Sequence, residues 1–200
     1  MYEQRDGGSD DKSTACARVK PAHLKLVCQW AVHLARALEF IHSYSFEKPS
    51  PKISIAFGDL RVESCWLDAS GTSLSIFGFL QSTVCTRWAG PYVGGICHNR
   101  FQPFTNRAGP TLETDLFLWG CVVYELMAGY WPGEGQGLEY EDKEALVSRK
   151  EWPRLEAKYL GEVVRKCWTG GITSAGEILS AVRTAVAEMT TRLLTLPSMA

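Results

Sequence analysis

The stretch TLETDLFLWGCVVYELMAG at residues 111–129 decides the fold of this chain. It is long enough for a helix and apolar on nearly every face, with Thr114 placed to cap its start and Gly129 its end. A helix that is apolar all round is normally surrounded by other elements. We therefore expect residues 114–128 to form the buried axis of a domain.

A second long helix is predicted at residues 22–42. Apolar side chains recur there at three- and four-residue spacing and form one continuous stripe, which needs a core to pack against. The stripe consists of Val27, Trp30, Ala31, Leu34, Ala37, Leu38 and Ile41. Three further helical segments are predicted in the C-terminal part, at residues 143–148, 157–168 and 174–192.

A small β-hairpin is predicted between the two long helices. Residues 65–67 and 73–77 resemble short strands and flank the turn-forming sequence Asp68-Ala69-Ser70-Gly71. Residues 80–110 are rich in glycine, proline, asparagine and arginine and show no periodicity, which indicates a long loop.

The chain is predicted to contain one folded domain, at residues 21–192. Its 200 residues are 46% hydrophobic and 22% charged, a composition typical of one globular domain with a sizeable core. Residues 1–20 are polar and small, so a disordered N-terminal arm is expected there. Residues 193–200 are expected to form a frayed tail.

Charge and cysteine content narrow the classes of function. With 21 basic and 22 acidic residues and no long basic stripe, neither nucleic acid nor an anionic membrane is expected as a partner. The seven cysteines are scattered and form no Cys-x-x-Cys pair, which favours free buried thiols. No signal peptide or membrane-spanning run is found, so we expect an intracellular protein, cytoplasmic or nuclear.

Five segments follow one another along the chain in an order that carries information. They are LEFIHS (38–43), GDLRVESCWLD (58–68), IFGF (76–79), TDLFLWGCVVYELMAGYWP (114–132) and RKCW (165–168). Together they resemble the C-terminal lobe of a protein kinase, in a style similar to divergent fungal kinase-like proteins. The matching parts are the helix before the catalytic loop, the loop H-R-D-L-x-x-x-N, D-F-G, the central helix and a late Cys-Trp helix. The resemblance implies a mostly α, α+β fold with a buried central helix and a small β-hairpin.

Asp59 is the one catalytic side chain that the resemblance retains. The matching aspartate of the family accepts the hydroxyl proton of the substrate. Ser64 stands where the family has an asparagine that holds magnesium, and Ile76 stands where D-F-G has its metal-binding aspartate. The resemblance therefore implies that both metal positions are changed, and no residue is predicted to bind a metal or a cofactor.

The frame of this loop is expected to survive for structural reasons. Phe77 and Gly78 keep the last two positions of D-F-G, and Phe57 replaces a histidine of the family's internal hydrophobic stack. Asp115 matches an aspartate of the central helix that binds the backbone of the catalytic loop. Gly58 replaces the arginine that pairs with a phosphorylated activation loop. The resemblance thus implies a preserved shape without the usual control by phosphorylation.

Other departures from the family point in the same direction. Gln102-Pro103-Phe104 stands in place of A-P-E, and the late helix lacks the Arg-Pro pair that would hold its glutamate. No glycine-rich loop and no V-A-I-K strand precede the long helix, so the small lobe is expected to be absent. Trp66 stands where the family has an aliphatic side chain under the adenine. Asp59 is expected to face an open cleft, so that Asp59→Ala would hardly change stability.

Three hypotheses about function remain. The first is a catalytically inactive pseudokinase or truncated kinase-like module that acts by binding a protein partner and uses no cofactor. The second is a divergent protein serine/threonine kinase that uses ATP and magnesium once a missing small lobe completes it. The third is a remnant without a selected activity. The sequence names neither the partner nor the oligomeric state.

Overall fold

The computed structural model describes residues 2–3, 18–44, 54–85, 110–134, 145, 149 and 151–195. The helices of this part are α1 (Pro21–Ser43), α2 (Leu112–Ala128), α4 (Gly161–Trp168) and α5 (Ala175–Thr195), with 3-10 turns η1 (Val62–Ser64), η2 (Phe79–Gln81) and η4 (Ala157–Tyr159). The strands are β1 (Tyr2–Glu3), β2 (Arg18–Val19), β3 (Ser54–Ala56), β4 (Cys65–Leu67), β5 (Leu74–Ile76) and β6 (Thr83–Cys85). The predicted class, mostly α with small β elements, is confirmed.

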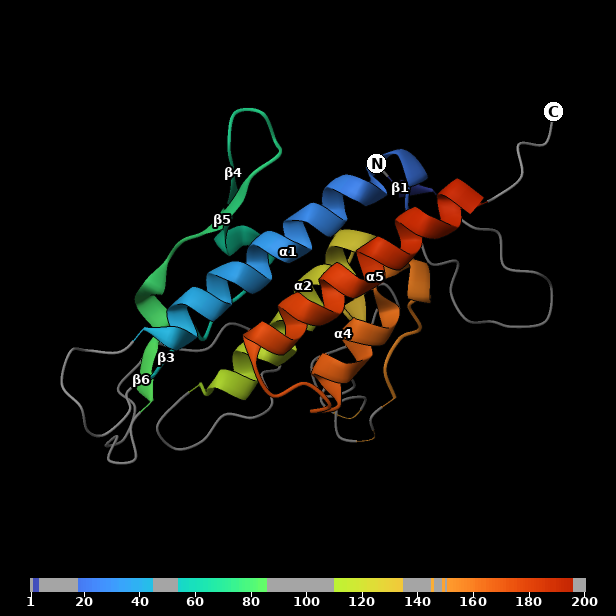
Figure 1. The fold of residues 1–200 in the computed structure, drawn as a ribbon. Coiled ribbons are helices and arrows are strands. Elements are labelled where there is room, and N and C mark those ends of the chain that lie inside the picture. Colours follow the sequence, from blue (N-terminus) through green and yellow to red (C-terminus); the bar gives the residue numbers. More distant parts are fainter. Residues whose placement is uncertain are drawn as a thin grey trace.

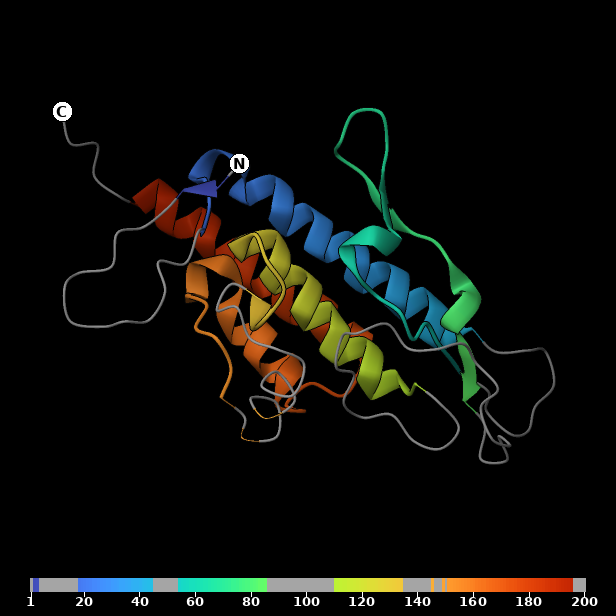
Figure 2. The same ribbon diagram turned by 180° about the vertical axis from the view of Figure 1, so that it is seen from behind.

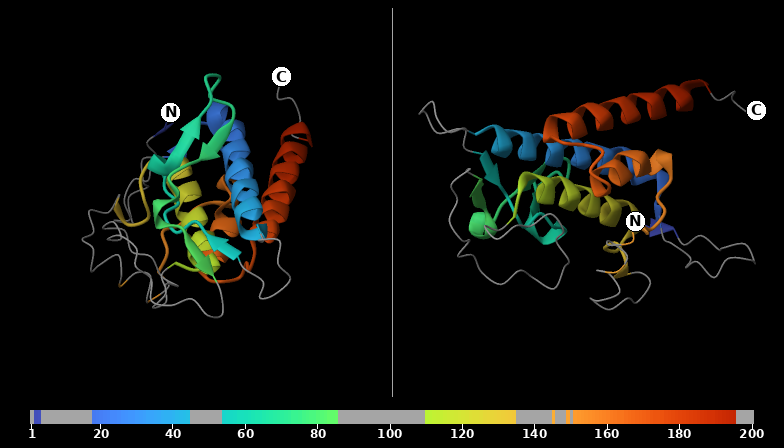
Figure 3. Two further views of the ribbon diagram at one scale, coloured as in Figure 1. Left: turned by 90° about the vertical axis from the view of Figure 1, so that its left-hand side faces the viewer. Right: turned by 90° about the horizontal axis from the view of Figure 1, so that it is seen from below.

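The helices form two layers around a common core (Figures 1 and 2). Helices α1 and α5 lie side by side and run in opposite directions, while α2 packs under α1 and against α4 (Figure 3). The apolar stripe predicted on α1 faces this core, because Ala31, Leu34 and Leu38 are completely buried. The two short sheets β3–β6 and β4–β5 lie beside α1 and contribute Ala56 and Leu74 to the buried interior.

Helix α2 is the buried axis that the sequence predicts. Val122 is completely buried, Leu126 is partly buried against the core, and Trp119 donates a hydrogen bond from its indole nitrogen to the carbonyl of Ala31 over 3.2 Å. Gly129 ends the helix in the left-handed conformation, with φ of 90°, as expected for a C-terminal glycine.

The predicted start of α2 was wrong by one turn. Thr111, rather than Thr114, is the N-cap, and the two threonines form a reciprocal capping box. The hydroxyl of Thr114 accepts the backbone N–H of Thr111 over 3.0 Å, and the hydroxyl of Thr111 accepts that of Thr114 over 3.4 Å. Either threonine can cap a helix, so the residue types alone did not decide which one does.

Helices α2 and α4 approach each other closely because Gly120 lies between them. A Cβ at this position would come within 3.0 Å of the indole nitrogen of Trp168 and 3.2 Å of the Cβ of Cys167. The same indole nitrogen donates to the sulfur of Cys121 over 3.3 Å. Trp168 also packs against Tyr124 of α2, with ring centroids 5.5 Å apart, so the late Cys-Trp helix is fixed to the central helix by aromatic packing.

The β-hairpin is present where the sequence predicts it, with strands β4 and β5 paired antiparallel from Cys65 opposite Ile76 to Leu67 opposite Leu74. Asp68 organises its turn, because one carboxylate oxygen accepts the backbone N–H groups of Thr72 and Ser73. These bonds lower the pKa of the Asp68 carboxyl. The hairpin projects from the body of the molecule (Figure 1).

Two other predictions need correction. Arg18 and Val19 are buried and pair with residues 2–3, so part of the arm predicted as disordered is structured. The segment 157–168 is not one helix, because Leu160 takes a left-handed conformation, with φ of 64°, and separates η4 from α4.

Two further predictions were wrong in part. Of the loop predicted at residues 80–110, residues 83–85 form strand β6, which pairs with β3, and residues 86–109 lie outside the described residues. Of the frayed tail predicted at 193–200, residues 193–195 continue α5, and residues 196–200 lie outside the described residues. Of the helix predicted at 143–148, only residue 145 is described, and it is helical.

Four of the cysteines have described side chains, and all four are free thiols, as predicted. Cys28, Cys121 and Cys167 are buried, and Cys65 is half-buried. Burial raises the pKa of Cys28 to about 11, raises that of Cys65 to about 12 with help from nearby carboxylates, and also raises that of Cys167. At neutral pH the thiols of Cys28, Cys65 and Cys167 are therefore protonated and do not act as nucleophiles.

Replacing Trp119 with alanine should destabilise the domain by about 3–5 kcal/mol, because a fully buried large aromatic leaves a cavity. Trp66→Ala is the matched control, since this indole is 68% exposed and its loss should cost less than about 1 kcal/mol. The measurement is the free energy of unfolding in a denaturant titration. Equal losses of stability for the two variants would contradict the assignment of α2 as the buried axis.

Candidate functional site

The carboxylate of Asp115 holds the loop at residues 57–61 against α2. Asp115 is completely buried, and its two oxygens accept the backbone N–H groups of Phe57 over 2.6 Å and Gly58 over 2.7 Å. This is the contact that the resemblance predicts for Asp115. Charge-assisted bonds to a buried carboxylate are among the stronger hydrogen bonds in proteins, so the loop is fixed through its backbone.

His42 is a third partner of Asp115 and was not predicted in this role. Its Nε2 lies 2.8 Å from the carboxylate oxygen that also accepts the N–H of Phe57. His42 lies in the last turn of α1, so the bond joins the C-terminal end of α1 to the N-terminal part of α2. In the sequence, His42 is only a polar residue next to Ile41, which belongs to the apolar stripe. Nothing in the sequence indicates that its partner is Asp115, 73 residues away.

Gly58 has a physical reason to be glycine. Its φ of 82° lies in the left-handed region, and a Cβ there would come within 2.5 Å of the carbonyl oxygen of Gln81. Both facts exclude a larger side chain unless the loop changes shape. An arginine, which the kinase family has at the matching position, therefore does not fit this backbone.

Asp59 does not face an open cleft, which corrects the expectation from the sequence. Asp59 is only 9% exposed, and one oxygen of its carboxylate lies 3.3 Å from the Nε of Arg61. Both side chains are partly shielded from water, so this ion pair is less screened than one on the open surface. Asp59→Ala would leave the Arg61 guanidinium without this counter-charge, and the substitution is no longer expected to be silent.

Ser64 and Ile76, which the resemblance matches to the two metal-binding positions of kinases, are engaged in local structure. The hydroxyl of Ser64 accepts the backbone N–H of Arg61 over 3.0 Å and donates to the carbonyl of the same residue over 2.8 Å. It thereby closes the 3-10 turn η1. Ile76 pairs with Cys65 in the hairpin and packs partly against the core. An aliphatic side chain offers no ligand to a cation.

Phe57 packs in the core as predicted. Its aromatic partner is Phe79, and not Phe77, the phenylalanine that matches D-F-G. Phe57 is completely buried, and the ring of Phe79 meets it edge-on with centroids 5.2 Å apart. Phe77 is 48% exposed and instead contacts Trp66. Gly78, which lies between Phe77 and Phe79 in the chain, takes a left-handed conformation with a φ of 87°.

An exposed hydrophobic surface adjoins this loop. Of the eight large hydrophobic residues that are exposed in the described part of the chain, five lie on the hairpin and on the turn η2 that follows it. They are Trp66, Leu67, Phe77, Phe79 and Leu80, here called the hairpin patch. Leu80 is 93% exposed. Scattered exposed apolar residues are ordinary, but such a concentration in one segment makes the hairpin patch a candidate site of interaction.

Removing the Asp115 carboxylate should cost about 2 kcal/mol or more, because the buried N–H groups of Phe57 and Gly58 lose their acceptor. Glu113→Ala is the matched control. Glu113 lies in the same first turn of α2 and is exposed, so its loss should cost less than about 1 kcal/mol. Thermal or chemical unfolding monitored by circular dichroism measures both. If the Asp115 carboxylate acted only on the helix dipole, removing it would lower the stability by the same amount as Glu113→Ala.

Comparison with known proteins gives no assignment, because no protein-family model matches the sequence and no curated protein matches it significantly. Within the described residues, no group of three or more histidine, cysteine, aspartate or glutamate side chains is placed to hold a metal ion. The helices of that part include none that is both long and apolar enough to cross a membrane. The predicted Gln102-Pro103-Phe104 match lies outside the described residues.

Proposed function

We propose that this chain is a protein kinase-like C-terminal lobe that does not transfer phosphate and acts by binding a protein partner. The observation that carries the proposal is the pair of hydrogen bonds from the loop amides of Phe57 and Gly58 to Asp115. The sequence resemblance predicts this contact between two segments that are 57 residues apart in the chain. The resemblance therefore extends from the order of motifs to a specific bond.

The chemistry of the loop supports a module without phosphotransferase activity. A kinase neutralises the charge of the transferring phosphoryl group with magnesium ions held by an aspartate and an asparagine. The matching positions here are Ile76, which has no ligand atom, and Ser64, whose hydroxyl is bonded to Arg61. Asp59 keeps the carboxylate that would orient a hydroxyl, but it is paired with Arg61. A loop that orients the hydroxyl but does not stabilise the charge of the transition state lacks what is usually the largest contribution to the rate.

The hairpin patch supports the binding half of the proposal. It contains two aromatic residues in edge-to-face contact, Trp66 and Phe77, and the nearly fully exposed Leu80. Tryptophan is among the residues that most often form the energetic centres of protein interfaces. The partner would be a protein surface that is itself apolar and covers the hairpin and η2.

The second candidate is a divergent protein kinase that uses ATP and magnesium when another polypeptide supplies the small lobe. One observation favours it: Asp59 is retained and is fixed by the same loop that Asp115 holds. This candidate requires metal ligands from outside the described residues, and the two candidates make opposite predictions about ATP.

We expect no phosphoryl transfer above background when the purified protein is incubated with radiolabelled ATP and magnesium or manganese, with itself or a general protein as acceptor. The matched variant is Asp59→Asn, which removes the charge and keeps the shape. Transfer that disappears in Asp59→Asn would contradict the proposal and favour the kinase candidate. A metal-dependent rise of the unfolding temperature with ATP would do the same, because a ligand that binds only the folded form stabilises it.

The double variant Trp66→Ser/Leu80→Ser should lose the protein partner, because both substitutions remove apolar area from the hairpin patch. Phe40→Ser is the matched control, since Phe40 is 71% exposed on α1 and outside the patch. The measurement is quantitative cross-linking followed by mass spectrometry, in cells that express each variant at equal level. A set of cross-linked proteins that is the same for both variants would contradict this surface as the docking site.

A further inference from the structure

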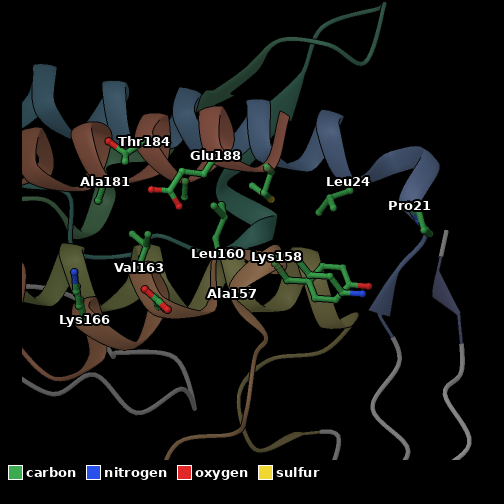
Figure 4. A pocket seen from close by; sticks show the side chains of 14 residues that line it. Pro21, Leu24, Ala157, Lys158, Leu160, Val163, Lys166, Ala181, Thr184 and Glu188 are labelled. Carbon is green, nitrogen blue, oxygen red and sulfur yellow. The ribbon is translucent and has the colours of Figure 1, made fainter. Parts of the chain in front are cut away.

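A pocket of about 580 Å³ lies between α1, the segment η4–α4 and α5 (Figure 4). Its lining includes two lysines and two glutamates, Lys158, Glu162, Lys166 and Glu188, so its charges balance and select neither an anion nor a cation. The β4–β5 hairpin, in contrast, has one closed edge and one open edge. The open edge adjoins the hairpin patch and restricts what can bind there.

Helix α1 closes the edge of the hairpin that β5 forms. The backbone N–H of Leu74 donates to the Nδ1 of His33 over 3.2 Å. In the adjoining turn, the indole N–H of Trp30 donates to the carbonyl of Gly71 over 3.1 Å. The N–H of β5 that points away from β4 therefore already has a partner, and α1 packs along this edge.

The hydrogen bonds of the hairpin show which backbone groups of β4 point outward. The N–H of Asp68 donates to the carbonyl of Ser73 over 3.0 Å, so these two residues form a hydrogen-bonded pair. Such pairs alternate with non-hydrogen-bonded pairs along an antiparallel ladder. The preceding residue, Leu67, therefore directs its N–H and C=O away from β5, and so does Cys65, two positions earlier.

These outward groups make the β4 edge open. The N–H of Cys65 is bonded to the carbonyl of Val62, but the C=O of Cys65 and both backbone groups of Leu67 have no hydrogen-bond partner in the part of the chain that the structure describes. Unpaired N–H and C=O groups along a strand edge are a template for an added strand. The edge can thus form three backbone hydrogen bonds with an extended peptide.

The side chains beside this edge restrict the sequence of such a peptide. Trp66 lies between the two outward residues, and its side chain is largely exposed. Residues 62–85 include two acidic residues, Glu63 and Asp68, and no lysine, arginine or histidine. Both acidic residues are exposed, and Asp68 directly follows β4. An added strand is therefore favoured when it carries an apolar side chain opposite Trp66 and a basic side chain opposite Asp68.

Charge and ladder geometry also decide between possible occupants and directions. A second copy of this chain fits poorly, because pairing of two β4 edges would bring two acidic hairpins together. Antiparallel addition is favoured over parallel addition, because the antiparallel ladder is more stable per residue. In an antiparallel strand, the residue opposite Asp68 lies two positions before the residue opposite Trp66.

We propose that the partner of the hairpin patch presents an extended segment that adds to β4 as a third, antiparallel strand, with a basic residue two positions before a large apolar one. The basic side chain lies beside Asp68, and the apolar side chain packs on Trp66. The residue between them exchanges two backbone hydrogen bonds with Leu67. The inference rests on the proposed function, since it concerns the same patch, and it adds the mode of binding and the chemistry of the partner.

The test is an NMR titration of the full chain with the peptide acetyl-Gly-Lys-Thr-Leu-Thr-Val-Gly-amide. We expect saturable binding of one peptide and a nuclear Overhauser effect between the Hα of Trp66 and the Hα of the peptide's leucine, which form a non-hydrogen-bonded pair. Glutamate in place of the peptide's lysine should weaken binding about fivefold, because it faces Asp68. Asp68→Asn keeps the oxygen that accepts in the turn and should remove most of this difference.

A matched pair of N-methylated peptides tests the backbone bonds on the native protein. Methylation of the threonine nitrogen before the leucine removes the donor to the carbonyl of Leu67 and should abolish binding. Methylation of the leucine nitrogen, which points away from β4, should change the affinity by less than about twofold.

A matched pair of substitutions tests the same bonds from the side of the protein. Leu67→Pro removes the outward N–H without removing a donor of the β4–β5 ladder, and it should weaken binding about tenfold or more. Leu67→Thr loses the same leucine side chain but keeps the N–H, and it should bind more tightly than Leu67→Pro. If Leu67→Pro does not fold, the two methylated peptides decide.

Strand addition would be overturned by the absence of saturable binding, by the absence of the Overhauser effect at Trp66, or by equal effects of the two methylations. Dimerisation of the protein through β4 in place of peptide binding would also overturn it. Any of these results leaves the proposed function standing if Trp66→Ser/Leu80→Ser still loses its cross-linked partner in cells. Unchanged cross-links in that variant would contradict the proposed docking surface itself.

Discussion

The hydrogen bonds of one buried carboxylate, Asp115, hold together three parts of the structure that are distant in sequence. They join the central helix α2, the loop that begins at Phe57, and His42 at the end of α1. A carboxylate without exposure to water is tolerated only when its oxygens are bonded, and here both are. The loop, the 3-10 turn η1 and the hairpin follow one another directly in the chain. Asp115 therefore fixes the point where this segment leaves the helices, while separate hydrogen bonds between α1 and the hairpin hold the hairpin itself.

Because Asp115 binds backbone N–H groups, the loop is held to α2 through its backbone rather than through its side chains, although the positive φ of Gly58 still requires a glycine there. If the proposed resemblance to kinases holds, Phe57 can stand in place of the family's histidine because the backbone still presents its N–H group to the carboxylate. The same reasoning applies to Ser64, whose hydroxyl closes a turn through the backbone of Arg61. A loop held in this way can keep its form after losing catalytic groups, which is the physical basis of the proposed function.

The sequence predicted what depends on local periodicity and on residue type. The stripe of α1, the buried α2 and the hairpin turn at Asp68 followed from such signals, whereas the contact between Asp115 and the loop was implied by the resemblance to the kinase family. What it missed depends on choices between equivalent residues or on contacts over long distances. Thr111 rather than Thr114 caps α2, Leu160 interrupts a segment that reads as helical, and Phe79 rather than Phe77 meets Phe57. The pairing of His42 with Asp115 exists only once the helices are packed.

The most direct test of the account is amide hydrogen exchange at Phe57 and Gly58, measured by NMR in the native protein and in Asp115→Asn. The amide side chain keeps the size of the carboxylate but replaces one acceptor oxygen with a donor. We predict that the amides of Phe57 and Gly58 are as protected as those of α2 in the native protein. In Asp115→Asn they should exchange much faster, while the middle of α2 stays protected. Unchanged protection of both loop amides in the variant would contradict the claim that Asp115 fixes the loop.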